Sequence, residues 1–94
     1  MACVYILYSL EINSYYVGSC LNFNNRFKEH LNHYREKAFT CRANDWIEFL
    51  KIEDLDYQQS RLIELHIKKM KSRVYIENLK LYPELRERLL NQYI

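Results

Sequence analysis

The hydrophobic pattern at the start of the chain predicts a β-hairpin. Residues Ala2 to Ser9 are rich in β-branched and aromatic side chains and contain no glycine or proline, which is typical of a buried strand. The polar segment Glu11 to Ser14 follows, and its Asn13 favours a turn. The segment Tyr15 to Cys20 is again short, aromatic and β-branched. The two apolar segments are therefore expected to pair as antiparallel strands.

After the hairpin the apolar spacing changes to that of a helix. Asn22 suits the N-cap position, and the helix is expected to run to about Lys37. Its apolar side chains are Phe23, Phe27, Leu31 and Tyr34. The segment Trp46 to Ile52 then predicts a third strand.

The last part of the chain predicts helices only. Asp56 and Gln59 resemble a capping box, and the helix behind them has an apolar stripe of Ile63, Ile67 and Met70. A shorter helix is expected from Ser72 to Leu81. Pro83 suits the first turn of a final helix bearing Leu85, Leu89 and Tyr93. The amphipathic segment from Tyr82 to Ile94 suits packing on its own core or on a second copy. The pattern predicts an α/β fold, with a small sheet of about three strands flanked by helices.

Composition bounds the class of protein. The chain has 94 residues, 49% of them hydrophobic, so a single domain over residues 1–94 is expected. Gly18 is the only glycine, which excludes a glycine-rich phosphate loop. The longest apolar stretch, Cys3 to Tyr8, is far shorter than the roughly 20 residues of a membrane span, so we expect a cytoplasmic protein without membrane partners.

The three cysteines are an odd number at irregular spacing, so the sequence predicts reduced thiols. A zinc site would have to combine Cys20, His30, His33 and Cys41, whose spacing matches no common ligand pattern.

Charge is concentrated rather than extreme. The formal net charge is +2, yet residues 61–73 hold five cationic side chains and the single carboxylate of Glu64. Such a segment suits a solvated helix face or a phosphate-binding surface.

An ordered set of residues resembles the GIY-YIG nuclease family. The set comprises Cys3-Val4-Tyr5, Tyr16-Val17-Gly18, Arg26 with His30, and Glu64. The resemblance covers nearly the whole chain. It is strongest to small stand-alone bacterial members related to the catalytic domain of the excision-repair nuclease, which share stretches like YYVGS and RFKEH. It implies a metal-dependent DNA endonuclease.

Phosphodiester hydrolysis needs an activated water, cations around the developing charge and stabilisation of the leaving oxyanion. The resemblance implies that Tyr5 is the general base, that Tyr16 and His30 orient water or phosphate, and that Arg26 steadies the phosphate. It assigns Glu64 to a divalent metal, Mg²⁺ or Mn²⁺, which a hard carboxylate oxygen suits. By chemistry alone His30 competes as the base, because a free imidazole has a pKa of about 6.5, which suits proton transfer at neutral pH.

Each of these residues also has a structural interpretation. Strand tyrosines commonly pack with the hydroxyl at the surface, and Glu64 can pair with Lys68 one helical turn later. His33 and His66 are expected to be structural or solvated. The cations expected to contact the DNA backbone are Lys28, Arg42, Lys68, Lys69, Lys71 and Arg73.

The chain departs from the family pattern at several positions. Cys3 stands where the family has its first glycine, which adds a side chain near the expected site. Asn13-Ser14 replaces the usual glycine of the hairpin turn. Gly18 is expected where the strand passes close to the scissile phosphate and a Cβ would intrude.

The function expected from these observations is structure-selective cleavage of branched or otherwise non-B-form DNA, in repair or recombination. The alternative is a catalytically weak DNA-binding or protein-interaction module on the same fold. An RNA-recognition platform fits less well, because the glycine-containing aromatic motif of such domains is missing from the sequence.

Overall fold

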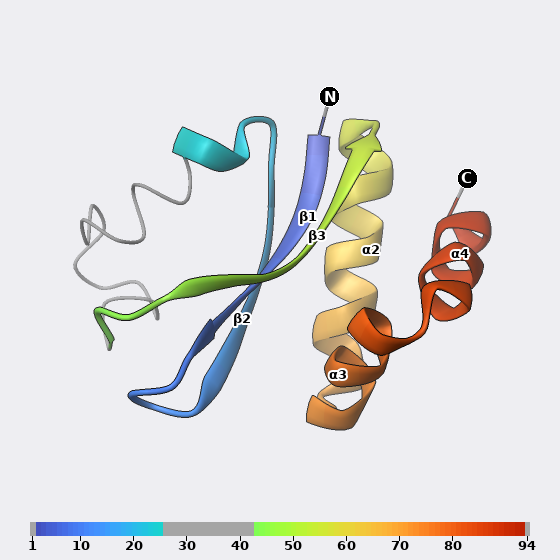
Figure 1. Cartoon of the computed structure of the whole chain (residues 1–94). Coiled ribbons are helices and arrows are strands. Elements are labelled where there is room, and N and C mark those ends of the chain that lie inside the picture. Colours follow the sequence, from blue (N-terminus) through green and yellow to red (C-terminus); the bar gives the residue numbers. More distant parts are fainter. Residues whose placement is uncertain (1, 26–42, 94) are drawn as a thin grey trace.

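The structure, a computed structural model, describes residues 2–25 and 43–93. Three strands form one antiparallel sheet in the order β2-β1-β3 (Figure 1). They are β1 (Ala2–Ser9), β2 (Ser14–Cys20) and β3 (Ile47–Leu55). The central strand is thus the first in the chain, and β2 is an edge strand. The predicted fold class, a hairpin plus one further strand with helices, is confirmed.

The hairpin turn uses Asn13 in place of the glycine expected at this point. Asn13 has a φ of 50°, in the left-handed region that asparagine tolerates better than most residues. The turn sets a register in which Tyr5 lies opposite Gly18 and Cys3 lies opposite Cys20.

Strand β3 begins one residue later than predicted, at Ile47 rather than Trp46. It is nevertheless longer than predicted, because it continues past Ile52 to Leu55. The pairing with β1 shifts between Ala2 and Val4, and Asp54 in this region has a φ of 61°. Such an irregularity lets β3 continue through the polar residues Glu53 and Asp54, which lie beyond the strand that the hydrophobic pattern predicts.

Three helices follow the sheet as predicted. They are α2 (Tyr57–Met70), α3 (Arg73–Leu81) and α4 (Pro83–Gln92). Asp56 caps α2 by accepting the Gln59 N–H at 2.7 Å, and Ser72 caps α3 by accepting the Tyr75 N–H at 3.1 Å.

The predicted helix after Asn22 is described only at its start. Asn22 Oδ1 accepts the Asn25 N–H at 3.1 Å, and residues 23–25 are helical. The N-cap prediction is therefore confirmed, and the remainder of that helix lies outside the described residues.

The three helices cover one face of the sheet (Figure 1). The core on this face is hydrophobic, and its buried members are Val4, Ile6, Val17, Ile52, Leu55, Ile63, Ile67, Leu79 and Leu89. Leu89 shows that α4 packs on the chain's own core. The predicted stripe of α2 is wrong at its end, because Met70 is 47% exposed at the last residue of the helix.

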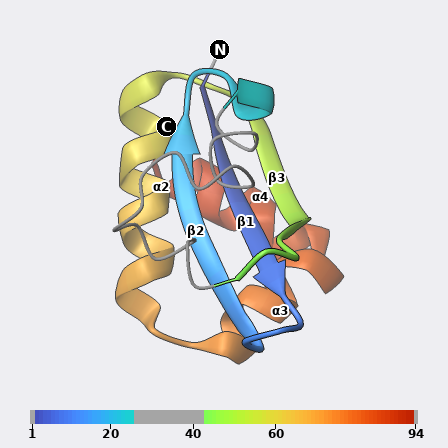
Figure 2. The ribbon, with the colours of Figure 1, turned by 90° about the vertical axis from the view of Figure 1, so that its left-hand side faces the viewer.

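Figure 2 looks onto the other face of the sheet, with the strands in front of the helices. A second cluster lies here and contains Cys3, Tyr5, Leu7, Ala43 and Trp46, with Ile12, Tyr16, Cys20 and Phe23 against it. Alternate residues of the same strands therefore supply two different faces.

Candidate active site

Tyr5 occupies the middle of the central strand and is 1% exposed. Its phenol lies over Gly18, because a Cβ built on Gly18 would sit 2.5 Å from Tyr5 Oη and 2.6 Å from Cζ. No real Cβ approaches another atom so closely, so glycine is what allows the Tyr5 ring to lie here. The sequence prediction places the scissile phosphate close to Gly18, and that approach stays a prediction; the group that lies against Gly18 among the described residues is the phenol of Tyr5.

Tyr16 lies on the same face as Tyr5. The two ring centroids are 6.3 Å apart, and Phe23 packs edge-on against Tyr5 at 5.4 Å. The structure thus brings together the two tyrosines that the resemblance selects. The other two residues of the set, Arg26 and His30, lie outside the described residues.

Glu64 lies on α2 and is only 7% exposed. Ser19 donates its hydroxyl to Glu64 Oε1 at 2.5 Å, and Lys68 Nζ lies 2.6 Å from Oε2. Arg61 Nη1 is 3.7 Å from Oε1. A buried carboxylate is costly unless it is paired and hydrogen-bonded, and Glu64 has both kinds of partner. The predicted pairing with Lys68 is confirmed.

Lys68 connects the carboxylate to the tyrosines. Its Nζ lies 6.0 Å from the centre of the Tyr16 ring as well as against Glu64. Ser19, the other partner of Glu64, directly follows Gly18 on the edge strand. The side chains of the set therefore gather around residues 16–19 of β2, with the tyrosines on one face of the sheet and Glu64 on the other.

The donor set around Glu64 fits a weakly held hard cation. Within residues 2–25 and 43–93, no group of three or more His, Cys, Asp or Glu side chains comes together. Mg²⁺ commonly keeps several waters and takes one or two carboxylates together with substrate phosphates, which a single glutamate satisfies. The Lys68 ammonium now neutralises the carboxylate, so a bound cation would take over that role.

The predicted DNA-contact cations divide between two sides of α2. Lys68, Lys71 and Arg73 line a pocket of about 290 Å³ beside β2. Lys69 instead lines a different pocket with His66 and Tyr93. Lys28 and Arg42 lie outside the described residues. The structure thus groups three of these cations along the edge strand and separates Lys69 from them.

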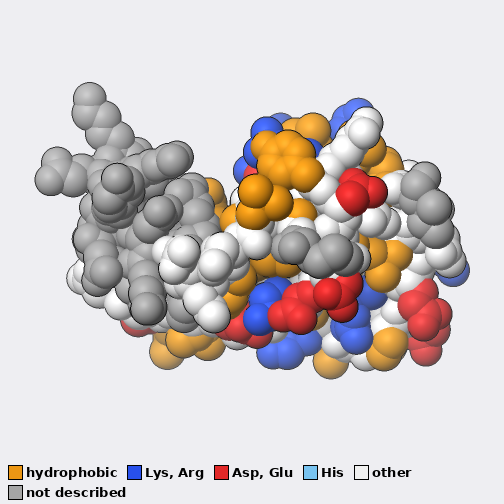
Figure 3. All heavy atoms as spheres, turned by 90° about the horizontal axis from the view of Figure 1, so that it is seen from above, with side chains coloured by type: hydrophobic (Ala, Val, Ile, Leu, Met, Phe, Trp, Pro, Cys, Tyr) orange, Lys and Arg blue, Asp and Glu red, His pale blue; other side chains and the backbone are white. Residues whose placement is uncertain are grey.

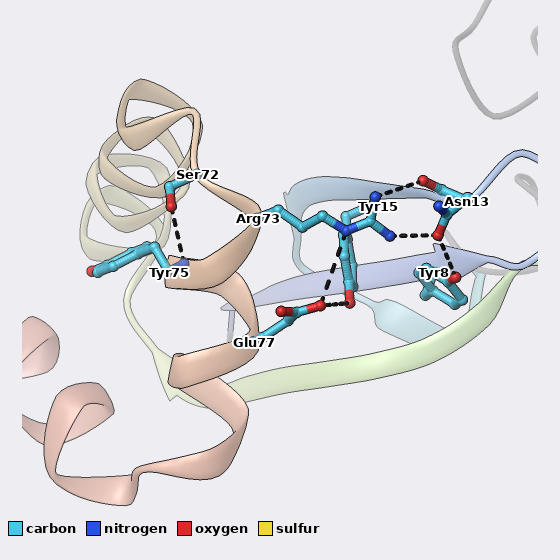
Figure 4. A network of polar contacts seen from close by, with 7 residues as sticks. All are labelled: Tyr8, Asn13, Tyr15, Ser72, Arg73, Tyr75 and Glu77. Atoms are coloured by element: carbon cyan, nitrogen blue, oxygen red, sulfur yellow. Dashed lines mark hydrogen bonds and ion pairs between the residues drawn. The ribbon is translucent and has the colours of Figure 1, made fainter.

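Arg73 also ties α3 to the hairpin turn (Figure 4). Its Nη1 donates to the Asn13 carbonyl at 3.1 Å and its Nη2 to Asn13 Oδ1 at 2.5 Å. Tyr8 donates its hydroxyl to the same Oδ1 at 2.8 Å, and Tyr15 donates to Glu77 at 3.1 Å. Desolvation and the bond to Glu77 raise the pKa of Tyr15, so this hydroxyl stays protonated as a donor.

The surface charge is mixed where Figure 3 views it, with acidic side chains beside basic ones. The local cation group beside β2, rather than the net charge of the chain, is therefore the feature that suits a phosphate backbone.

Two predictions about histidine and cysteine are tested here. His66 Nδ1 lies 2.8 Å from Tyr93 Oη, and its ring packs against Tyr75, so its predicted structural role is confirmed. His33 lies outside the described residues. Cys3 and Cys20 carry free thiols that share a hydrogen bond with Sγ atoms 3.6 Å apart, whereas Cys41 lies outside the described residues. Burial and that bond raise the pKa of Cys3 to about 12.

The comparison with protein families decides the identity of the fold. The GIY-YIG catalytic domain matches residues 1–78, a range that includes Tyr5, Tyr16, Gly18 and Glu64. The chain belongs to the GIY-YIG family. Searches of curated proteins and of solved structures found no significant match.

Membership of the GIY-YIG family implies a nuclease that acts on DNA, and the family generally uses a divalent metal. The second cluster and the Glu64 contacts contain the described residues that the family resemblance assigns to the site. Among the described helices, none has both the length and the apolar character needed to cross a bilayer.

Sequence reasoning missed two contacts of this GIY-YIG domain. Ser19 was not singled out, although strand alternation places it on the opposite face from Gly18, toward the helices. The Cys3–Cys20 contact was missed because the two residues are distant in sequence. That contact could have been predicted by counting paired residues outward from the turn at Asn13, because this register places Cys3 opposite Cys20.

Proposed function

We propose that this chain is a structure-selective DNA endonuclease that hydrolyses phosphodiester bonds with one divalent metal ion, in DNA repair or recombination. The observation that carries the proposal is the gathering of Tyr5, Tyr16 and Glu64 around one segment of an edge strand. An edge strand leaves one side open to a partner, and the cations beside β2 suit a DNA backbone.

Tyr5 is proposed as the general base. Its hydroxyl is held at a defined position over Gly18, which is the positioning that proton transfer requires. Tyr16, beside it, would orient water or phosphate. His30 stays the competing base, and Arg26 stays the proposed phosphate ligand; both roles rest on the family resemblance.

Glu64 would hold Mg²⁺ or Mn²⁺, and the metal would supply charge stabilisation at the phosphate. Ser19 fixes one oxygen of the carboxylate from β2, and Lys68 neutralises it before the metal binds. A single protein carboxylate predicts weak metal binding without DNA.

The proposal also covers the subgroup within the family, the extent of the domain and the location in the cell. The short motifs quoted above support a relationship to the stand-alone members that resemble the excision-repair nuclease. One domain over residues 1–94 is supported by Leu89 of α4, which is buried in the same core as Val4. The cytoplasmic location stays a prediction from composition.

A second candidate is a DNA-binding module with little catalysis. Tyr5 is 1% exposed, and both oxygens of Glu64 are engaged by protein side chains, so the described site is closed. Such a module would bind branched DNA in a salt-sensitive way and leave it uncut.

The test is cleavage of branched, flapped, nicked and plain duplex DNA in Mg²⁺ or Mn²⁺. We expect metal-dependent cutting of the non-duplex substrates and a loss of about 100-fold or more for Glu64→Gln. Glu84→Gln, at the start of α4, is the matched control and should cut like the unchanged protein. Binding without cutting would favour the module. If the protein neither bound nor cut DNA in low salt, both candidates would be excluded.

A further inference from the structure

The thiols of Cys3 and Cys20 face each other across the two strands that carry the candidate site. They occupy paired positions at the end of the hairpin, with Sγ atoms 3.6 Å apart. Directly opposed residues of an antiparallel pair have Cα atoms about 4.5 to 5.5 Å apart, within the range of about 4.4 to 6.8 Å found across disulfides. The two sulfurs can therefore join with only a small shift of β2 toward β1.

We propose that Cys3 and Cys20 are a reversible disulfide site that links β1 to the edge strand β2. The bond would close the hairpin at the end opposite its turn. It would also fix the strand that bears Tyr16, Gly18 and Ser19 against the strand that bears Tyr5.

The two thiols differ in accessibility, which assigns an order to the reaction. Cys20 is partly exposed, whereas Cys3 is 6% exposed. The raised pKa of Cys3 also leaves it little thiolate, the form that attacks a disulfide. Cys20 is therefore the attacking residue and Cys3 the one that closes the bond.

The oxidant would be a low-molecular-weight disulfide such as oxidised glutathione. The Cys20 thiolate attacks it, forms a mixed disulfide and releases one small thiolate. Cys3 then loses its proton and attacks the Cys20 sulfur, which releases the second small thiolate. The two protein thiols lose two electrons, and the small disulfide gains them.

Closure should also slow DNA cleavage, a step that rests on the proposed function. The sulfurs would move from 3.6 Å to about 2.0 Å apart, two residues from the Tyr5 and Gly18 pair on the same face. The Tyr5 phenol lies so close over Gly18 that a Cβ there would sit 2.5 Å from Tyr5 Oη, so a shift of β2 toward β1 would displace the hydroxyl.

The experiment uses the full chain with Cys41→Ser, so that only the proposed pair remains. Treatment with oxidised glutathione should remove both free thiols and raise Tm by about 5 to 15 °C without linking chains to one another, and a dithiol reductant should reverse both changes. Arg26 is the first basic residue, so Cys3 and Cys20 share one tryptic peptide, residues 1–26, which should become lighter by two hydrogen atoms. Persistent thiols, a retained glutathione adduct or a disulfide between chains would overturn the proposal.

The single variants test the order of attack. Cys3→Ser should keep one glutathione on Cys20, whereas Cys20→Ser should react at least about tenfold more slowly because Cys3 is buried. Equal reactivity of the two variants would overturn the assigned order.

Cleavage by the oxidised and reduced forms separates this inference from the proposed function. We expect the oxidised form to cut at least about threefold more slowly, and Cys20→Ser to be insensitive to the oxidant. An unchanged rate after complete closure would overturn the regulatory step. Closure in a protein that cuts no DNA in either state would remove the nuclease proposal alone, and cutting by a protein whose thiols never close would remove the disulfide alone.

Discussion

The two faces of the sheet share the same strands and differ in chemistry. The face under the helices is filled with aliphatic side chains such as Ile6, Val17 and Ile63. The opposite face carries the hydroxyls of Tyr5 and Tyr16 and two thiols among its apolar residues. Successive residues of a strand point to opposite faces of the sheet, so the same strands supply both sets of side chains.

The difference teaches how a small domain can separate stability from chemistry. Buried aliphatic residues supply most of the free energy of folding, and they tolerate no polar group without a partner. The polar groups that we propose to act on a substrate lie on the other face and at the sheet edge. Glu64 is the exception, since it comes from the helix side and reaches the edge with Ser19 and Lys68 as partners.

The largest expected effect on stability comes from the helix-covered face. Ile63 is 0% exposed, so Ile63→Ala should lower the free energy of unfolding by about 2 to 5 kcal/mol, measured by denaturant titration. The rate of DNA cleavage per folded molecule should stay the same at a temperature where the variant is folded. A large loss of cleavage in the fully folded variant would break the separation between the two faces.

Gly18→Ala tests the face that carries Tyr5 and Tyr16. The added Cβ would overlap the Tyr5 phenol, so the ring must move, and we expect cleavage to fall by about tenfold or more. Overpacking should cost about 1 to 3 kcal/mol of stability, measured by thermal and denaturant unfolding. Gly18→Val should show the same bias toward lost activity more strongly. If activity fell only in proportion to the folded fraction, Gly18 would be merely structural.

Lys68→Ala and Lys69→Ala form a matched pair on neighbouring residues of one helix. Lys68 lies beside β2 and Glu64, whereas Lys69 lies with His66 on another side of α2. Lys68→Ala should weaken DNA binding severalfold and lower the salt dependence of log Kd by about one unit, as measured by fluorescence anisotropy. Equal effects of the two changes would show that DNA does not follow the edge strand.

The smallest effect concerns pH and the hairpin turn. The Ser9 hydroxyl donates to Asp45 at 2.5 Å and holds the pKa of that carboxyl below its usual range. A lowered pKa contributes stability above the unfolded pKa of about 3.9, and this contribution is lost as the pH falls through the folded pKa. Asp45→Asn should therefore lose less Tm than the unchanged protein between pH 6 and about pH 3. An identical acid response in both proteins would show that this pair does not couple folding to pH.

Much of the fold follows from local sequence signals. The caps at Asp56 and Ser72 and the proline at the start of α4 each act within a few residues, so the helix starts were predicted correctly. The extension of β3 to Leu55 was missed, because its end depends on pairing with Ala2 across an irregular register.

The site was predictable in part. Spacing and resemblance selected Tyr5, Tyr16 and Glu64, and the structure gathers them around β2. The partners of these residues could not be predicted from the sequence pattern, because Ser19 contacts Glu64 only when α2 packs on the sheet. Contacts of this kind depend on tertiary packing, which local preference does not encode.

The most direct test of the central claim compares Tyr5→Phe with Tyr82→Phe. Both changes remove one phenolic hydroxyl, from the buried reactive face in the first case and from a side chain that is 54% exposed in the second. The measurement is the single-turnover rate of DNA cleavage with saturating metal, made on protein shown to be folded. We expect Tyr5→Phe to lose about 100-fold or more and Tyr82→Phe to stay within about twofold. Cleavage by Tyr5→Phe at the unchanged rate would contradict the account and move the role of the base to His30.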